Sequence, residues 1–134
     1  AVLAGALHGL FCLGWLMEHH ISDVPADLRA TPRKVTTVAY ATLRWGSRAA
    51  TLVPASYFLL VIPLSLSLWR HDSLWLVKSI PSITMALVAA GTAVNTNPNS
   101  IVDITGRERS LSLIAFTHVI WLSLALTNAF SWPN

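Results

Sequence analysis

Charged residues are scarce in this sequence of 134 residues. They make up 11% of the chain, whereas 54% of its residues are hydrophobic. Soluble domains carry about 25% charged residues, and a soluble core of this size could not bury so much apolar surface. The shortage of charge therefore excludes an ordinary soluble domain and indicates a membrane protein.

Cysteine and the common active-site motifs are also nearly absent. Cys12 is the single cysteine, which excludes an internal disulfide. Nucleotide-binding loops, serine-nucleophile motifs and haem-attachment motifs are missing. So are His-x-x-x-His and Cys-x-x-Cys pairs, and we therefore expect no metal site, although His8, Cys12, His19 and His118 could be combined into one. No motif identifies a cofactor.

Long apolar runs are what the sequence has in plenty. A membrane-spanning helix needs about 20 mostly apolar residues, and these runs do not alternate as transmembrane strands do. We predict an all-α integral membrane protein, a single domain over residues 1–134 that folds as a four-helix transmembrane bundle. The predicted helices cover residues 1–17, 49–69, 74–94 and 111–130, and good helix formers extend the second one back toward Val35.

The basic residues predict an orientation. Seven of the nine Lys and Arg residues lie in the linkers after the first and third predicted helices, and only Arg70 and Lys78 lie on the other side. Cytoplasmic loops of membrane proteins are enriched in Lys and Arg. We therefore expect both basic linkers in the cytoplasm and both termini outside or in a lumen. Basic residues that flank apolar runs suit anionic headgroups, so we expect membrane lipid, and no nucleic acid, as a partner.

Histidines inside the apolar runs are the first candidates for chemistry, because ionisable residues are costly to place in a membrane. His8 lies midway along the first predicted helix, and His118 lies in the first half of the fourth, at a somewhat different depth. We interpret both as candidate catalytic bases. The alternative is a purely structural role, in which each histidine makes one hydrogen bond to a neighbouring helix. His8 and Cys12 share a helix face through their i, i+4 spacing.

Other polar residues gather near the predicted helix ends. The segment Glu18–His20 follows the first predicted helix, and we favour a helix end that meets water over interfacial acid–base chemistry. Arg44 and Arg48 could bind an anionic headgroup or the acidic part of a substrate, but we favour ordinary membrane-flanking charge. Asn97 and Asn128 are further candidates to line a cavity with the histidines.

A motif-like segment leads into the second predicted helix. Aromatic residues, a glycine and a basic residue precede a proline, and a Thr-Asn pair ends the third helix. On these residues the stretch from Tyr40 to Asn99 resembles the small four-helix membrane family that includes fungal anthrone oxygenases. The glycine-to-proline spacing is longer here, and the fourth helix keeps only Trp121 and Asn128 of that family's Trp, Asn and Arg. The residues that carry the resemblance are Tyr40, Trp45, Gly46, Arg48, Pro54, Thr96 and Asn97.

The resemblance implies an enzyme that oxidises a lipophilic aromatic polyketide, which would be a membrane oxygenase or another oxidoreductase. It makes Arg48, Asn97, Asn128 and Trp121 candidate substrate-binding residues beside the two histidines. A lipophilic small molecule is then the expected ligand.

Two other functions stay open. The short loops and the missing motifs also suit a non-catalytic subunit of a larger membrane complex. Alternatively, His8 and His118 could ligate haem in a haem- or quinone-binding anchor. Small residues such as Gly5 and Gly14 indicate close helix contacts, so a homo-oligomer is a further expectation.

Overall fold

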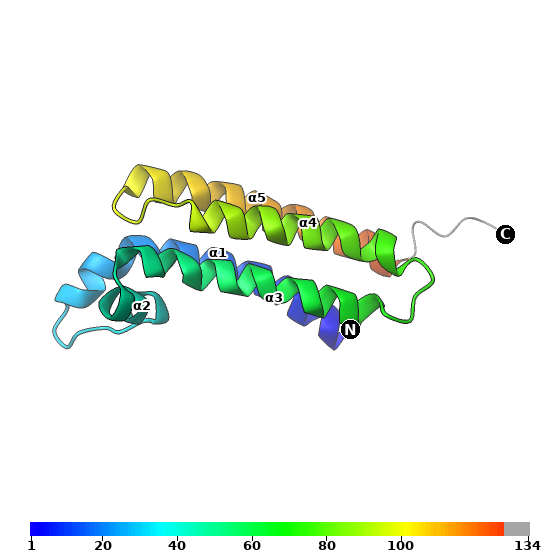
Figure 1. Ribbon diagram of the computed structural model, residues 1–134, viewed down its shortest axis with the longest axis horizontal. Helices are drawn as coiled ribbons and strands as arrows, with labels where there is room; N and C mark the ends of the chain where they lie inside the picture. Colours follow the sequence, from blue (N-terminus) through cyan, green and yellow to red (C-terminus); the bar gives the residue numbers. More distant parts are fainter. Residues whose placement is uncertain (128–134) are drawn as a thin grey trace.

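The computed structural model describes residues 1–127, and its architecture is a bundle of long helices (Figure 1). The predicted all-α fold is confirmed, because every regular element among these residues is a helix. In chain order the elements are α1 (Val2–Arg29), α2 (Thr37–Trp45), the 3₁₀ helix η1 (Ser47–Thr51), α3 (Leu52–Trp69), α4 (Trp75–Val94) and α5 (Ile101–Leu126).

Four of these helices run along the long axis of the molecule and form a ring of neighbours. α1 packs on α3 and α5, and α4 packs on the same two helices. The segments Val2–Arg29, Ser47–Trp69, Trp75–Val94 and Ile101–Leu126 are long and apolar enough to cross a membrane. Large exposed apolar side chains cover all four helices, as expected for surfaces that face lipid. The chain is accordingly a multi-pass membrane protein.

The first helix is longer than its apolar run. α1 continues past the predicted end at residue 17 to Arg29, where the backbone becomes extended at Ala30. The prediction followed hydropathy, but helical hydrogen bonds continue into polar sequence as long as nothing breaks them. Thr31 precedes Pro32, and a residue before proline disfavours helical angles. Pro32 therefore favours this end of α1, although Pro25 lies inside the helix without ending it.

The last helix also departs from its predicted bounds. α5 begins at Ile101 rather than at residue 111, because Ser100 caps its N-terminus. The Ser100 side chain accepts a hydrogen bond from the Asp103 backbone at 3.3 Å, and Asp103 in the first turn suits the helix dipole. The described part of the helix ends at Leu126. The predicted end at residue 130 lies outside the described residues.

The segment before the second span forms a separate helix. The extension toward Val35 is wrong as one continuous helix, because Gly46 has a φ of 88° and interrupts it. Thr36 caps α2 by accepting a hydrogen bond from the Ala39 backbone at 3.2 Å. The chain then re-enters the bundle through η1 and α3, close to the predicted start at residue 49. The third span, Trp75–Val94, matches its prediction within one residue.

Both basic linkers lie at the same end of the bundle, on the left of Figure 1. Contacts between the two linkers' flanking residues confirm this placement. Thr96 of the α4–α5 loop donates a hydrogen bond to Glu18 of α1, and His19 lies 3.2 Å from Glu108 of α5. The short α3–α4 loop and the start of α1 lie at the opposite end.

Candidate functional site

Two histidines from distant parts of the sequence meet inside the bundle. His8 of α1 and His118 of α5 place their Nδ1 atoms 3.4 Å apart. His118 has no exposed surface, and the ring of Phe11 stacks on it with a centroid separation of 4.2 Å. Because α1 and α5 are neighbours in the bundle, facing helix surfaces bring the two imidazoles together.

Two further side chains extend this pair in both directions. Cys12 lies one turn after His8, with its Sγ atom 3.5 Å from His8 Nε2. On the other side, the Oγ atom of Ser82 on α4 lies 3.2 Å from His118 Nε2. Four polar side chains from three helices therefore form one connected series, Cys12–His8–His118–Ser82, which we call the polar chain.

The hydrogen bonds of the polar chain can run in either of two opposite directions. In one, the Cys12 thiol donates to His8, His8 donates to His118, and His118 donates to Ser82. In the other, every donor becomes an acceptor. A neutral imidazole has one N–H and one lone pair, so both senses leave both rings neutral. Neither sense therefore requires an imidazolium in the apolar interior, where a charge is costly.

A groove between α1 and α5 reaches one end of the polar chain. Its volume is ≈ 530 Å³, within the range of about 300–1,000 Å³ typical of small-molecule sites. His8 and Cys12 line it together with apolar side chains that include Trp15 and Phe116. His118 lies behind His8 and is fully buried. A molecule in this groove would therefore meet His8 and Cys12 first.

A second buried polar cluster lies nearer the basic end. Glu18 is fully buried, and its Oε1 atom accepts a hydrogen bond from Thr96 Oγ1 at 2.5 Å. Its other oxygen, Oε2, has no hydrogen-bond partner among the described residues. The expectation that Glu18 meets water at a helix end is wrong, because α1 continues for another three turns and carries Glu18 on its inner face.

The structure separates the predicted substrate-binding residues from the histidines. Arg48 donates to the Thr96 carbonyl at 3.5 Å, and the exposed Asn97 lies in the adjacent α4–α5 loop. Both belong to the neighbourhood of Glu18, which lies ten residues, or about 15 Å, along α1 from His8. Asn128 lies outside the described residues.

Trp121 lies closer to the polar chain, but on the side toward α4 and away from the α1–α5 groove. Its Nε1 atom donates to the Lys78 carbonyl at 3.3 Å. Lys78 precedes Ser82 by one turn of α4, so Trp121 and His118, one turn apart on α5, pack against successive turns of the same helix. Trp121 therefore lies where it can hold α5 against α4 next to His118.

Ser82 is the member of the polar chain that the sequence did not single out. A serine within an apolar helix is common, and only the partner from another helix distinguishes this one. Glu18 carried a clearer signal, since a carboxylate just beyond an apolar run is costly to bury. Among residues 1–127, no group of three or more His, Cys, Asp or Glu side chains is arranged to hold a metal ion.

The chain was compared with protein-family models, with curated proteins and with solved structures, and none of these matches it. The polar chain and the groove beside it are therefore the features that bear on function.

Proposed function

We propose that this protein is a small integral membrane enzyme that binds a lipophilic substrate in the α1–α5 groove and removes a proton from it with His8. The observation that carries the proposal is the 3.4 Å contact between His8 and the buried His118 beside an apolar groove lined by His8. A histidine in such a place is costly in a membrane, and a second one behind it gives the accepted proton somewhere to go.

The polar chain supports a role for His8 as a general base. The long contact from His8 Nε2 to the Cys12 thiol, which is a weak donor, is the one that a substrate O–H or activated C–H would replace. As Nε2 accepts the substrate proton, the Nδ1 proton of His8 passes to Nδ1 of His118. The two imidazoles share the resulting positive charge, and Ser82 stabilises it by accepting a hydrogen bond from His118 Nε2. The proton returns through His8 to the oxygen that leaves as water.

The reaction class that we favour is oxygenation of an aromatic polyketide, which is the class implied by the resemblance of Tyr40–Asn99. Deprotonation of an activated methylene leaves an electron-rich carbanion, and dioxygen is the oxidant. One oxygen atom becomes the new carbonyl, while the other leaves as water with both methylene hydrogens. His8 supplies the deprotonation, and the groove keeps the reacting carbon away from bulk water.

The geometry favours this reaction over haem ligation. Two axial histidines must leave the porphyrin plane and its iron between them, whereas His8 and His118 contact one another directly. We also propose that the basic end of the bundle faces the cytoplasm, because seven of the nine Lys and Arg residues lie there.

The test uses the full chain in liposomes with a panel of lipophilic phenols and anthrone-type carbon acids, with dioxygen uptake and product formation as readouts. We expect His8→Gln to lower turnover by about 10²–10⁴-fold. The matched control is His71→Gln, since His71 is exposed in the α3–α4 loop. Equal activity of the two variants would remove His8 from the mechanism. No turnover together with a second polypeptide that co-purifies in fixed ratio would favour a subunit of a larger complex.

A further inference from the structure

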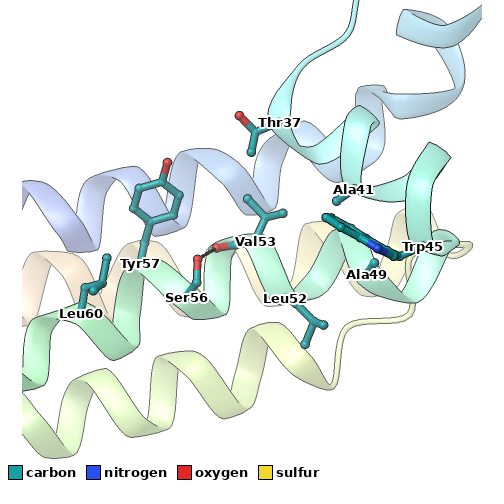
Figure 2. Close-up of a pocket in the computed structure, with 9 residues that line it drawn as sticks. All are labelled: Thr37, Ala41, Trp45, Ala49, Leu52, Val53, Ser56, Tyr57 and Leu60. Carbon is teal, nitrogen blue, oxygen red and sulfur yellow. Dashed lines mark hydrogen bonds between the residues drawn. The ribbon is translucent and has the colours of Figure 1, made fainter.

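A second groove lies at the basic end of the bundle. It shares no lining residue with the α1–α5 groove beside the polar chain. It is formed between α2, η1 and α3 and has a volume of ≈ 480 Å³. Figure 2 shows Trp45 of α2 over the small Ala49 of η1, with Leu52, Ser56 and Leu60 following along α3. From residue 52 to residue 60 the lining extends about 12 Å along the helix axis.

The lining of this groove is mainly apolar, although Thr37, Ser56 and Tyr57 contribute hydroxyl groups. Ser56 Oγ donates to the Val53 carbonyl within α3 at 2.7 Å, so its hydroxyl is already satisfied (Figure 2). Ala41 and Ala49 leave the space that larger side chains would fill. A mainly apolar groove along a membrane-spanning helix suits a hydrocarbon chain rather than a polar solute.

The mouth of the groove at α2 is strongly basic. Between Asp27 and Asp72 the chain has no acidic residue, and five of its six Lys and Arg residues in that stretch lie at this end. Arg33, Lys34, Arg44 and Arg48 are exposed, and none of them forms an ion pair with another described residue. Their charge is therefore not neutralised by the carboxylates that the structure describes.

Aromatic residues place α2 at the membrane surface. Tyr40 and Trp45 are 53% and 68% exposed, and their rings meet edge to face with centroids 6.0 Å apart. Exposed Tyr and Trp beside basic residues are typical of the headgroup region. The opposite face of α2, with Val38, Ala39 and Ala41, is buried against the bundle. This helix therefore presents charge at headgroup depth next to an apolar groove that descends along α3.

We propose that the α2–α3 groove is a binding site for one anionic phospholipid, whose acyl chain lies along α3 and whose phosphate lies against Arg44 and Arg48. Charge complementarity selects this occupant, because Arg44 and Arg48 form no ion pair with a described residue and a zwitterionic lipid would bring them no net counter-charge. The site is distinct from the α1–α5 groove, so it does not depend on the proposed enzymatic function.

The test is native mass spectrometry of the full chain, released from detergent that contains equal amounts of phosphatidylglycerol and phosphatidylcholine with identical acyl chains. We expect one phosphatidylglycerol to stay bound in preference to phosphatidylcholine. Arg44→Gln should weaken it about fivefold, as expected for the loss of one basic residue at a lipid surface. Arg109→Gln is the matched control, because Arg109 is an exposed arginine of α5 at the same end of the bundle.

The acyl chain is tested with a second pair of variants. Ser56→Trp fills the groove from its exposed side and should abolish retention of the lipid, whereas Leu59→Trp, an exposed position of α3 that does not line the groove, should preserve it. Three results would overturn the proposal: no preference for phosphatidylglycerol, equal losses in Arg44→Gln and Arg109→Gln, or equal retention in the two tryptophan variants. Displacement by water-soluble glycerol phosphate would also overturn it, since that result indicates a headgroup site without an acyl chain.

Discussion

The Nδ1 atoms of His8 and His118 lie 3.4 Å apart, although the two residues are 110 positions apart in the sequence. One ring must donate and the other must accept, because two lone pairs or two N–H groups would repel one another. The pair therefore fixes complementary tautomers, and Cys12 and Ser82 at its two ends fit either assignment. Because the tautomer of one histidine sets that of the other, the pair differs from two histidines that each make a separate hydrogen bond to a neighbouring helix.

We predict that the two histidines are energetically coupled. His8→Asn, His118→Asn and the double variant should form a cycle whose coupling energy of unfolding is about 0.5–1.5 kcal/mol, the net contribution of one hydrogen bond. His118→Asn alone should be the more harmful change, because it leaves the buried Ser82 without its partner. Unfolding in mixed micelles with increasing denaturing detergent measures these energies. A cycle of His118→Asn with His71→Asn is the control and should be additive; additivity in the first cycle as well would contradict the coupling.

Glu18 gives a second prediction, because its Oε2 atom is buried without a partner. Glu18→Gln keeps an oxygen that can accept from Thr96 and removes the risk of burying a charge, so we expect stability to be unchanged or increased. Glu18→Ala leaves both a void and an unsatisfied Thr96 hydroxyl, and should cost about 2–4 kcal/mol. Thermal unfolding in one detergent compares the two variants. Equal losses would mean that the carboxylate, and not the shape and hydrogen bond of the side chain, stabilises the bundle.

Hydropathy predicted the bundle but misplaced the depth of its polar residues. The four apolar runs were enough to identify the spans, since they do not alternate as transmembrane strands do and a helix satisfies its own backbone in lipid. The histidines, however, were placed at different depths, because the first helix was ended at residue 17 and the last one was started at residue 111. α1 continues to Arg29 and α5 begins at Ile101, and with these bounds His8 and His118 lie at one level.

The partners within the polar site depended on which helix faces meet, and local sequence carries little information on that. His8 and Cys12 could be paired from their i, i+4 spacing alone. Ser82 could not, because its contact with His118 depends on how α4 is rotated against α5. Arg48 and Asn97 were grouped with the histidines through the family resemblance, whereas the structure places both beside Thr96, in the neighbourhood of Glu18.

The α3–α4 loop provides a prediction on pH. Asp72 accepts hydrogen bonds from Lys78 Nζ at 2.5 Å and from the Leu74 backbone at 2.8 Å. The contact with Lys78, and then the one with Leu74, holds the pKa of the Asp72 carboxyl below its usual value. A lowered pKa in the folded state contributes stability that is present above the ordinary pKa of an aspartate and is lost as the pH falls through the lowered value.

We therefore expect Asp72→Asn to lower the melting temperature at neutral pH, and this difference from the wild type to shrink toward zero in acid. Melting curves from pH 7 down to the acid limit of the detergent measure it. Asp27→Asn is the matched control, since the Asp27 carboxylate forms no ion pair among residues 1–127. A difference that is constant with pH would contradict the assigned role of the Lys78 contact.

The tight packing of α1 on α3 at Gly14 gives the last prediction. A Cβ atom added to Gly14 of α1 would lie 2.6 Å from two ring atoms of Phe58 on α3. Phe58 is fully buried and packs against Phe11 with ring centroids 5.9 Å apart, so its ring has little room to move. We expect Gly14→Ala to destabilise the bundle by about 1–3 kcal/mol through overpacking.

Gly9 of the same helix is the matched control, because nothing lies within 4 Å of a Cβ added there. Gly9→Ala should leave stability unchanged or raise it by up to about 1 kcal/mol through helix propensity. Combining Gly14→Ala with Phe58→Leu, which frees space for the methyl group, should cost less than the sum of the two single changes. Equal effects of alanine at positions 9 and 14 would show that α1 and α3 do not approach each other as the structure describes.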